Sequence, residues 1–84
     1  MILAKIYVTL KQSVLDPQGS AVLHALQQHG YDEVDDVRIG KYLEMKLDTT
    51  DKAHAEERCN EMCERLLANT VIESYRIELQ EVKA

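Results

Sequence analysis

The chain has 84 residues and a formal net charge of −5, from 10 Lys and Arg residues against 15 Asp and Glu residues. This length allows one domain, spanning residues 1–84, and so small a domain hides only about 60–65% of the surface that its unfolded chain would expose. The excess of acidic groups repels a phosphate backbone, which argues against a nucleic-acid partner.

The composition also bears on where the protein works. Its two cysteines, Cys59 and Cys63, are too few for the disulfide framework of a small secreted domain. No stretch approaches the roughly 18 apolar residues of a membrane span, and Lys5 interrupts the short apolar run near the first residue. We therefore expect a soluble cytoplasmic protein with no membrane partner, whose small core favours self-association.

The first expected element is a strand over residues 2–11. Apolar side chains at the even positions from Ile2 to Leu10 alternate with a mixed set at the odd positions from Leu3 to Lys11. This period of two is typical of a strand with one buried face.

A helix is expected next, from Pro17 to about His29. Asp16 can accept hydrogen bonds from the free amides of the first turn, and proline at the first helical position loses no bond. Gly30 suits a left-handed stop, with Tyr31 in apolar contact with the helix. The stripe expected to face the core is Val22, Ala25, Leu26 and His29.

Residues 34–47 are expected to form a long, bent second strand. The odd positions from residue 37 onward are apolar except for Lys41, whose ammonium group would be costly to bury alone. Fully extended, this region would be about 46 Å long at roughly 3.3 Å per residue, which is more than a domain of this size can cover. It must therefore bend, at Asp35–Asp36 or at Gly40, or project as an arm. The Lys41 side chain is then either exposed to solvent because the strand bends, or in contact with another molecule.

A second helix is expected from the "DTTDK" stretch to about Ala68. Thr49, Thr50 or Asp51 can cap it, and Asn69 tolerates a left-handed exit. The expected buried stripe is Ala55, Cys59, Met62, Cys63 and Leu66, with Leu67 beside it, and the expected exposed ion pair is Glu61 with Arg65.

A last strand, from Val71 to about Glu81, completes an α+β fold. The order strand, helix, long bent strand, helix, strand predicts a two-layer sandwich related to the ferredoxin-like folds, with both helices on one face of the sheet. The other face would combine two tyrosine rings with many charges, which suits a wet protein interface better than a core. Its members are Lys5, Tyr7, Thr9, Lys11, Arg38, Tyr42, Glu44, Lys46, Arg76 and Glu78.

Groups that could carry out chemistry are sparse in this sequence. The two cysteines lie four apart on the second helix with no histidine near that face, so they suit core packing better than a metal site. No nucleophile, base or cofactor motif can be assembled around His24, His29 or His54. "DPQG" offers helix amides to an anion, but Asp16 already fills that position and no P-loop pattern follows. A small phosphatase would need an arginine in the loop 12–16, which has none. We therefore predict no catalytic residue, no metal ligand and no bound cofactor in this chain.

Arg38, Gly40 and Lys41 are the residues least explained by folding. One interpretation makes Gly40 a bulge and the two cations sheet-surface groups paired with Glu44 or Glu73. The other makes them contacts for a partner. The sequence by itself favours neither.

Three stretches resemble the signature stretches of the PurS family, the small subunit of the three-part bacterial phosphoribosylformylglycinamidine synthase. They are "VTLKQSVLDPQGSAVLHAL", "VRIGKYLEMKL" and "MCERLLANTVIESYRIE". They follow one another in the family's order and at its spacing, and with their connections they cover the chain from about Ala4 to Glu78.

The resemblance implies a non-catalytic subunit of a ligase of de novo purine biosynthesis. In that family the glutaminase subunit, PurQ, releases ammonia from glutamine. The synthetase subunit, PurL, uses ATP and magnesium to install the ammonia on formylglycinamide ribonucleotide. PurS forms dimers and docks the glutaminase on the synthetase, and the resemblance extends to assistance with ammonia transfer. Dimer and tetramer both stay open here.

Carried over residue by residue, the family's motif positions suggest a partner interface. The hypothesis is that Lys41 and Arg38 lie where the bent strand leaves its own core and meets the dimer mate or the synthetase, with Gly40 permitting the bend. Together with Tyr42 from the charged sheet face, the candidate interface residues are Lys11, Asp16, Pro17, Gly19, Arg38, Gly40, Lys41, Asn69, Glu73 and Tyr75.

A second function stays open on the same fold. A stand-alone ferredoxin-like regulatory domain could bind a small molecule between helix and sheet or across a dimer. Thermal stabilisation of the isolated chain by such a ligand would favour that function over a purely assembling subunit.

Overall fold

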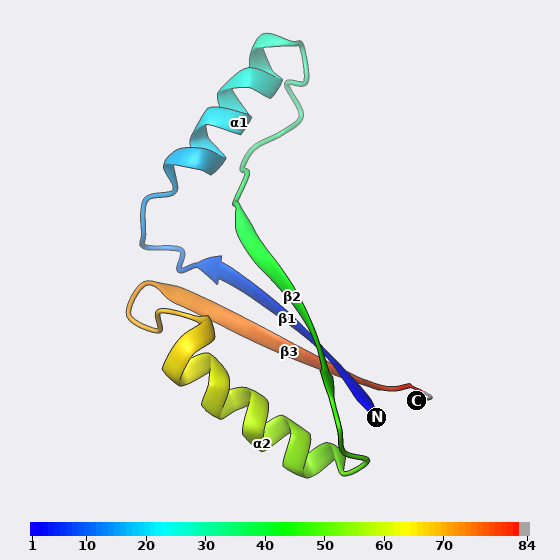
Figure 1. Cartoon of the computed structure of the whole chain (residues 1–84). Helices are drawn as coiled ribbons and strands as arrows, with labels where there is room; N and C mark the ends of the chain where they lie inside the picture. The colour runs from blue at the N-terminus through cyan, green and yellow to red at the C-terminus, as the bar shows by residue number, and fades with distance from the viewer. Residues whose placement is uncertain (83–84) are drawn as a thin grey trace.

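A three-stranded antiparallel sheet forms the body of the protein, with one helix across it and a second helix beyond its end (Figure 1). The computed structural model describes residues 1–82. The order of elements confirms the predicted α+β class. It is β1 (Ile2–Leu10), α1 (Pro17–Gln28), β2 (Gly40–Leu47), α2 (Lys52–Met62), the π-helical turn η1 (Cys63–Leu67) and β3 (Glu73–Glu81).

β1 is the central strand, and its alternation decides which face of the sheet is covered. The strand order is β2-β1-β3, with Ile2 opposite both Leu47 and Glu81. The even-numbered residues Ile2 to Val8 are fully buried, as the period of two predicts. α2 and η1 lie over this face. The core there comprises Ile6, Val8, Cys63 and Ala68, with Leu43, Met45, Leu67, Tyr75 and Ile77 packed against it.

The first helix, α1, does not cover the sheet as predicted, but projects beyond its end on an arm, which we define as residues 15–39 (Figure 1). The molecule measures 48 × 29 × 14 Å, and its radius of gyration is 16.3 Å, against about 12 Å for a compact chain of this length. The predicted core stripe of α1 is consequently wrong. Val22 is 40% exposed, Ala25 and His29 are exposed, and Leu26 is half-buried.

The ends of both helices follow the sequence signals. Asp16 and Asp51 are the N-caps, so the second helix uses the last of its three possible caps. Gly30 has a φ of 92° and ends α1, while the Tyr31 N–H donates to the Leu26 carbonyl at 3.0 Å. The predicted left-handed stop is therefore confirmed.

The second strand is shorter than predicted, because pairing begins only at Gly40, opposite Thr9. β1 ends one residue later, at Leu10, so residues 34–39 have little strand left to pair with. Of the alternatives left open by the sequence, projection as an arm is the one observed. The long bent strand is wrong.

The last turn of the second helix is π-helical and changes which leucine is buried. The Ala68 N–H donates to the Cys63 carbonyl, five residues back, so one extra residue enters this turn. The face that carries Cys63 consequently continues to Leu67, which packs against the core, and Leu66 is 84% exposed. The prediction that Leu66 belongs to the buried stripe is wrong for this reason, and Met62 is only half-buried.

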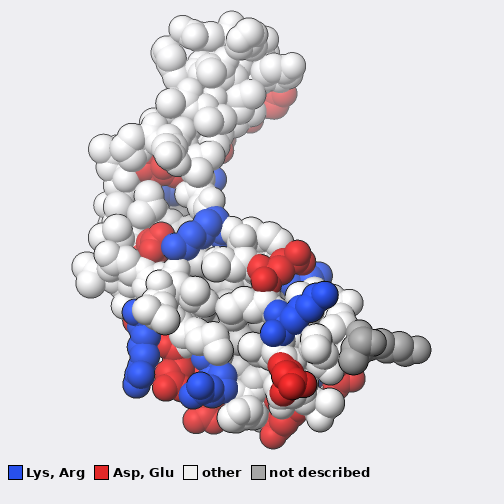
Figure 2. Space-filling view, viewed as in Figure 1, with Lys and Arg blue, Asp and Glu red and all other residues white. Residues whose placement is uncertain are grey.

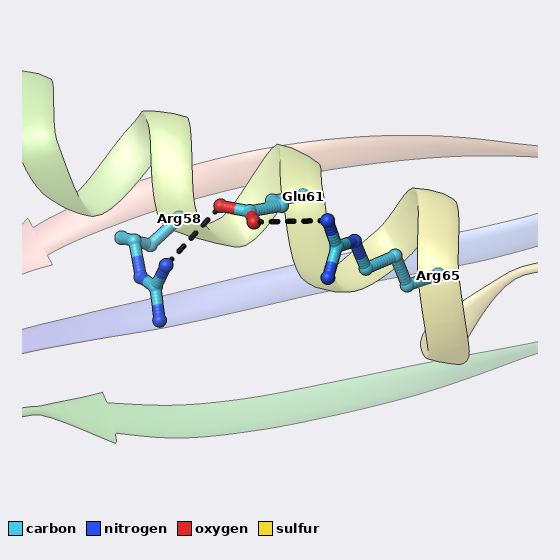
Figure 3. Close-up of polar contacts among 3 residues, drawn as sticks. All are labelled: Arg58, Glu61 and Arg65. Carbon is cyan, nitrogen blue, oxygen red and sulfur yellow. Dashed lines mark hydrogen bonds and ion pairs between the residues drawn. The ribbon is translucent and has the colours of Figure 1, made fainter.

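Two further predictions for the second helix concern its cysteines and its charged face. Cys59 and Cys63 are fully buried free thiols, and burial raises the pKa of each. The predicted ion pair of Glu61 with Arg65 is present at 3.6 Å, and Arg58 contacts the same carboxylate at 3.2 Å (Figure 3). These exposed pairs contribute little to stability.

The π-helical turn predicts that substitutions at two neighbouring leucines change the free energy of unfolding by very different amounts. Leu67→Ala should lower the free energy of unfolding by about 2 kcal/mol, because it leaves a cavity in the core. Leu66→Ala should change it by less than about 0.5 kcal/mol, because that side chain is in solvent. Urea unfolding at one fixed protein concentration measures both. A larger loss for Leu66→Ala would contradict the π-helical register.

Candidate functional site

The three signature stretches meet at one end of the sheet. β1 ends there, β2 and β3 begin there, and η1 ends beside them (Figure 1). Two hollows lie at this end, and they share Lys41 and Glu73. The arm hollow, about 450 Å³, is lined by Leu10, Asp16, Pro17, Gln18, Ile39, Gly40, Lys41 and Glu73. The helix hollow, about 470 Å³, is lined by Lys41, Glu64, Arg65, Leu66, Leu67, Ala68, Asn69, Thr70 and Glu73.

Asp16 uses both carboxylate oxygens to join the segment that enters the arm to the segment that leaves it. Oδ1 accepts from the Gly19 N–H at 3.0 Å, which is the predicted helix cap. Oδ2 accepts from the Ile39 N–H at 2.8 Å, on the segment that returns to β2. The side chain is only 4% exposed. The bond from Ile39, then that from Gly19 and the charge of Arg38, hold the pKa of Asp16 below its ordinary value.

Arg38 is occupied within its own chain and does not join the charged sheet face as predicted. Its Nη2 donates to the Lys11 carbonyl at 2.7 Å and to the Val14 carbonyl at 3.3 Å, and Nη1 also reaches Val14 at 3.3 Å. The guanidinium therefore fastens the returning segment to the loop after β1. The pairing with Glu44 or Glu73 weighed from the sequence is not among its described contacts.

Gly19 and Gly40 mark close backbone approaches at the same base. A Cβ at position 19 would overlap the Val37 carbonyl oxygen, so only glycine lets α1 lie against the returning segment. A Cβ at position 40 would overlap the Val8 carbonyl oxygen. Both glycines of the signature stretches consequently have a steric role in this chain.

Lys41 lies on the core-facing row of β2 without being buried. It pairs with Val8 in the register, but its side chain is exposed, because it lies at the end of the sheet where the helix hollow opens. None of the ion pairs in the described part of the chain involves it. An ammonium group beside two hollows is thus available to a carboxylate from outside the chain.

Asn69, Glu73 and Tyr75 organise the turn that enters β3. The Asn69 N–H donates to Glu73 Oε1 at 2.7 Å, and Asn69 Oδ1 accepts from the Val71 N–H at 3.2 Å. Among the described residues no φ is positive outside glycine, so the predicted left-handed exit at Asn69 is wrong. The chain leaves η1 through an extended Ala68 instead, with φ −135° and ψ 145°.

Tyr75 fastens this strand to the second helix. Its hydroxyl contacts Asn60 Oδ1 at 3.2 Å and Glu64 Oε1 at 3.0 Å. Burial, and then the bond to Glu64, raise the pKa of Tyr75. The hydroxyl is therefore a neutral donor at physiological pH.

Tyr42 lies apart from the hollows, on the outer face of the sheet. Its ring is 5.0 Å from that of Tyr7, and the Arg76 guanidinium lies 4.2 Å from the Tyr7 ring centre. Its hydroxyl donates to Glu44 at 3.0 Å, and desolvation, followed by this bond, raises the pKa of Tyr42 to about 12. The predicted polar outer face is present, although Arg38 is not part of it.

The two hollows are lined by a mixture of charged, amide and apolar side chains. Within residues 1–82, no three His, Cys, Asp or Glu side chains gather as a metal would require. Among residues 1–82, no helix combines the length and the apolar character that crossing a bilayer requires. The sequence analysis missed the second bond of Asp16 and the carbonyl contacts of Arg38. No local signal could reveal them, since the partners are 23 to 27 residues apart.

Comparisons with known proteins agree along nearly the whole chain. The family model described as PurS, phosphoribosylformylglycinamidine (FGAM) synthase, matches residues 3–81. The phosphoribosylformylglycinamidine synthase subunit PurS of Bacillus subtilis is 60% identical over 80 residues, covering 95% of this chain and 94% of that protein. Its counterpart from Archaeoglobus fulgidus is 39% identical, covering 94% of this chain and 99% of that protein.

Solved structures show the same likeness in three dimensions. A crystal form of B. subtilis PurS superposes with a TM-score of 0.86 at 58% identity, covering 96% of this chain and 100% of that one. A chain of the structure of PurLQS from Thermotoga maritima superposes with a TM-score of 0.84 at 26% identity, covering 95% of this chain and 99% of that one.

The close approach at Gly19 predicts that even alanine is not tolerated there. Alanine favours a helix over glycine by about 1 kcal/mol, but its methyl group would meet a backbone oxygen that cannot move cheaply. Gly19→Ala should therefore lower the free energy of unfolding by about 1–2 kcal/mol in urea. Ser20→Ala, on the exposed side of the same turn, is the control and should stay within about 0.5 kcal/mol.

The lowered pKa of Asp16 predicts a loss of stability in acid. A carboxylate with a lowered pKa in the folded protein stabilises it at neutral pH, and this contribution disappears as the pH falls through the folded-state pKa, below 3.8. Unfolding free energies measured from neutral pH to about pH 2 should fall more for the native chain than for Asp16→Asn. Glu78, whose pKa Arg76 lowers, titrates in both proteins and cancels in the difference. Parallel curves would contradict the role of Asp16.

Proposed function

The chain belongs to the PurS family, and we propose on this premise that it acts as the small, non-catalytic subunit of phosphoribosylformylglycinamidine synthase in purine biosynthesis. It would work as one domain, in the cytoplasm. Likeness to a chain of the T. maritima PurLQS structure over 95% of its length is the observation that carries this proposal. The mixed charged and apolar lining of the two hollows supports it.

Its task would be to dock the glutaminase subunit on the synthetase subunit, and to help ammonia pass between them. ATP and magnesium would be used by the synthetase and not by this chain. The chemistry of the site fits such a role, since the helix hollow holds two cations, Lys41 and Arg65, and two carboxylates, Glu64 and Glu73. A balanced set of charges suits a polypeptide segment better than a phosphate ligand.

Lys41 would be the central contact of this docking site. It is exposed and lines both hollows, and it shares the helix hollow with Leu66, which is 84% exposed. Apolar side chains beside an available ammonium group form the mixed surface that protein interfaces use. Asp16, Gly19, Arg38 and Gly40 would act indirectly, since their groups are occupied by the chain itself.

Self-association, as a dimer or a tetramer, is the second part of the proposal. The side chains of β2 that face the helix layer, Leu43, Met45 and Leu47, are only half-buried, because α2 packs on β1 and β3. On the face drawn in Figure 2, charged side chains gather over the body, and the sequence of α1 contains no Asp, Glu, Lys or Arg. An uncharged helix held away from a half-open sheet supports burial against another copy.

The docking site predicts that reversing the charge of Lys41 weakens assembly. Lys41→Glu should reduce the affinity for the synthetase and glutaminase subunits at least about tenfold, because like charges would face each other in a desolvated contact. Mixtures containing magnesium, nucleotide and glutamine are followed by size-exclusion chromatography with light scattering, and by glutamine-dependent activity. Lys52→Glu, at the far end of α2, is the matched control and should assemble normally.

Two outcomes separate the parts of this proposal. If Lys41→Glu assembles and supports activity as the native chain does, the docking site is wrong while the subunit role stands. If the native chain joins neither subunit, the subunit role itself is wrong. Thermal stabilisation of the isolated chain by a metabolite would favour the regulatory domain instead.

A further inference from the structure

The base of the arm contains a set of contacts that nothing in the fold of α1 requires. We call it the latch: the Asp16 carboxylate on the Ile39 N–H, the Arg38 guanidinium on the Lys11 and Val14 carbonyls, and Gly19 against Val37. α1 needs only the Gly19 bond for its cap. The other contacts join the segment after β1 to the segment that returns to β2.

The latch is anchored to the sheet on both sides. Ile39 directly precedes Gly40, the first residue of β2, and the Lys11 N–H donates to the Ile72 carbonyl at 2.8 Å, just before β3. Fixing Asp16 to Ile39 therefore fixes the first turn of α1 relative to the sheet. Two flexible connections would otherwise leave the helix free to swing.

The hydrogen bonds of the latch are also strong, because they involve charged groups that are largely shielded from water. The Asp16 side chain is 4% exposed and accepts two backbone bonds of 3.0 and 2.8 Å as an ionised group, and Arg38 is the nearby cation. Charge-assisted bonds that water hardly reaches hold their geometry better than exposed ones. Such strength is needed because α1 itself makes little contact with the body (Figure 1).

We propose that Asp16 and Arg38 are positioning residues, which fix the direction of the arm so that it meets its partner already aligned. The proposal rests on the assembling function proposed above, and gives the "DPQG" and "RIG" motifs a task other than touching a partner. The physical gain is preorganisation. If an unlatched arm spent only about a tenth of its time in the right direction, the affinity of assembly would fall about tenfold.

A single substitution can open the latch and keep the helix cap. In Asp16→Asn, the amide oxygen can still accept from the Gly19 N–H, and asparagine is as good an N-cap as aspartate. Its NH2 group would then face the Ile39 N–H, and two donors cannot bond. Asp51→Asn is the matched control, because Asp51 caps α2 through His54 at 3.2 Å and its described bonds include no second segment.

The direction of the arm can be measured in the isolated chain. Spin labels on Gln27→Cys of α1 and Gln80→Cys of β3 report the distance between arm and sheet, and both native positions are exposed. The native cysteines are fully buried, and labelled chains are diluted in unlabelled ones so that only distances within one chain are read. We expect one narrow distance distribution for the native chain and Asp51→Asn, and a broad or shifted one for Asp16→Asn.

Assembly with the synthetase and glutaminase subunits is then measured for the same three proteins. Asp16→Asn should bind at least about tenfold more weakly, and Asp51→Asn within about twofold of the native chain. An unchanged distance distribution in Asp16→Asn overturns the latch. A broadened distribution with unchanged assembly overturns its positioning role. Failure of the native chain to assemble counts instead against the proposed function.

A second variant guards against a simple failure to fold. Arg38→Lys keeps the charge, but a single ammonium group lacks the planar fork that serves both carbonyls. It should broaden the arm distance in the same way, whereas Arg58→Lys on the exposed face of α2 should not. Equal distributions for these two variants would contradict the role of Arg38.

Discussion

One buried carboxylate determines how this molecule is laid out around its sheet. Asp16 begins the first helix with one oxygen and takes the amide of Ile39 with the other, so the helix starts where the second strand is about to begin. Ile39 directly precedes β2, so this bond ties the start of the helix to the start of the strand. The base of the arm and the wall of the arm hollow, which Asp16 and Ile39 both line, depend on this contact.

The arm leaves apolar surfaces of the helix and of the sheet uncovered, as in a subunit of a protein complex. A helix that carries no charged residue is held away from the body, and the sheet keeps a half-exposed strip along β2. A short chain cannot cover every apolar face with its own residues, and surfaces left open in this way are typical of subunits. Because the arm projects from the sheet, the molecule is extended, with a radius of gyration of 16.3 Å.

The π-helical turn at the end of the second helix has a similar consequence on a smaller scale. One inserted residue directs Leu67 into the core and Leu66 into solvent, and lets the chain leave through an extended Ala68. An α-helical ending would have kept Leu66 on the face that carries Cys63, because residues three apart share a face of an α-helix. The turn instead places an exposed leucine beside Lys41 and shapes the helix hollow. Both unusual features of the fold thus lie at the end of the sheet where the signature stretches meet.

The sequence by itself determined the class of the fold, the order of its elements, the helix caps and the buried face of β1, because each depends on residues within a few positions of one another. The likeness of three stretches to the signature stretches of PurS also indicated the family. Only the tertiary structure decided where α1 lies, where β2 begins, which leucine is buried, and that Arg38 binds its own chain and not the outer face. These outcomes depend on contacts between segments 23 or more residues apart, such as Asp16 with Ile39, and no local period or propensity encodes such a contact.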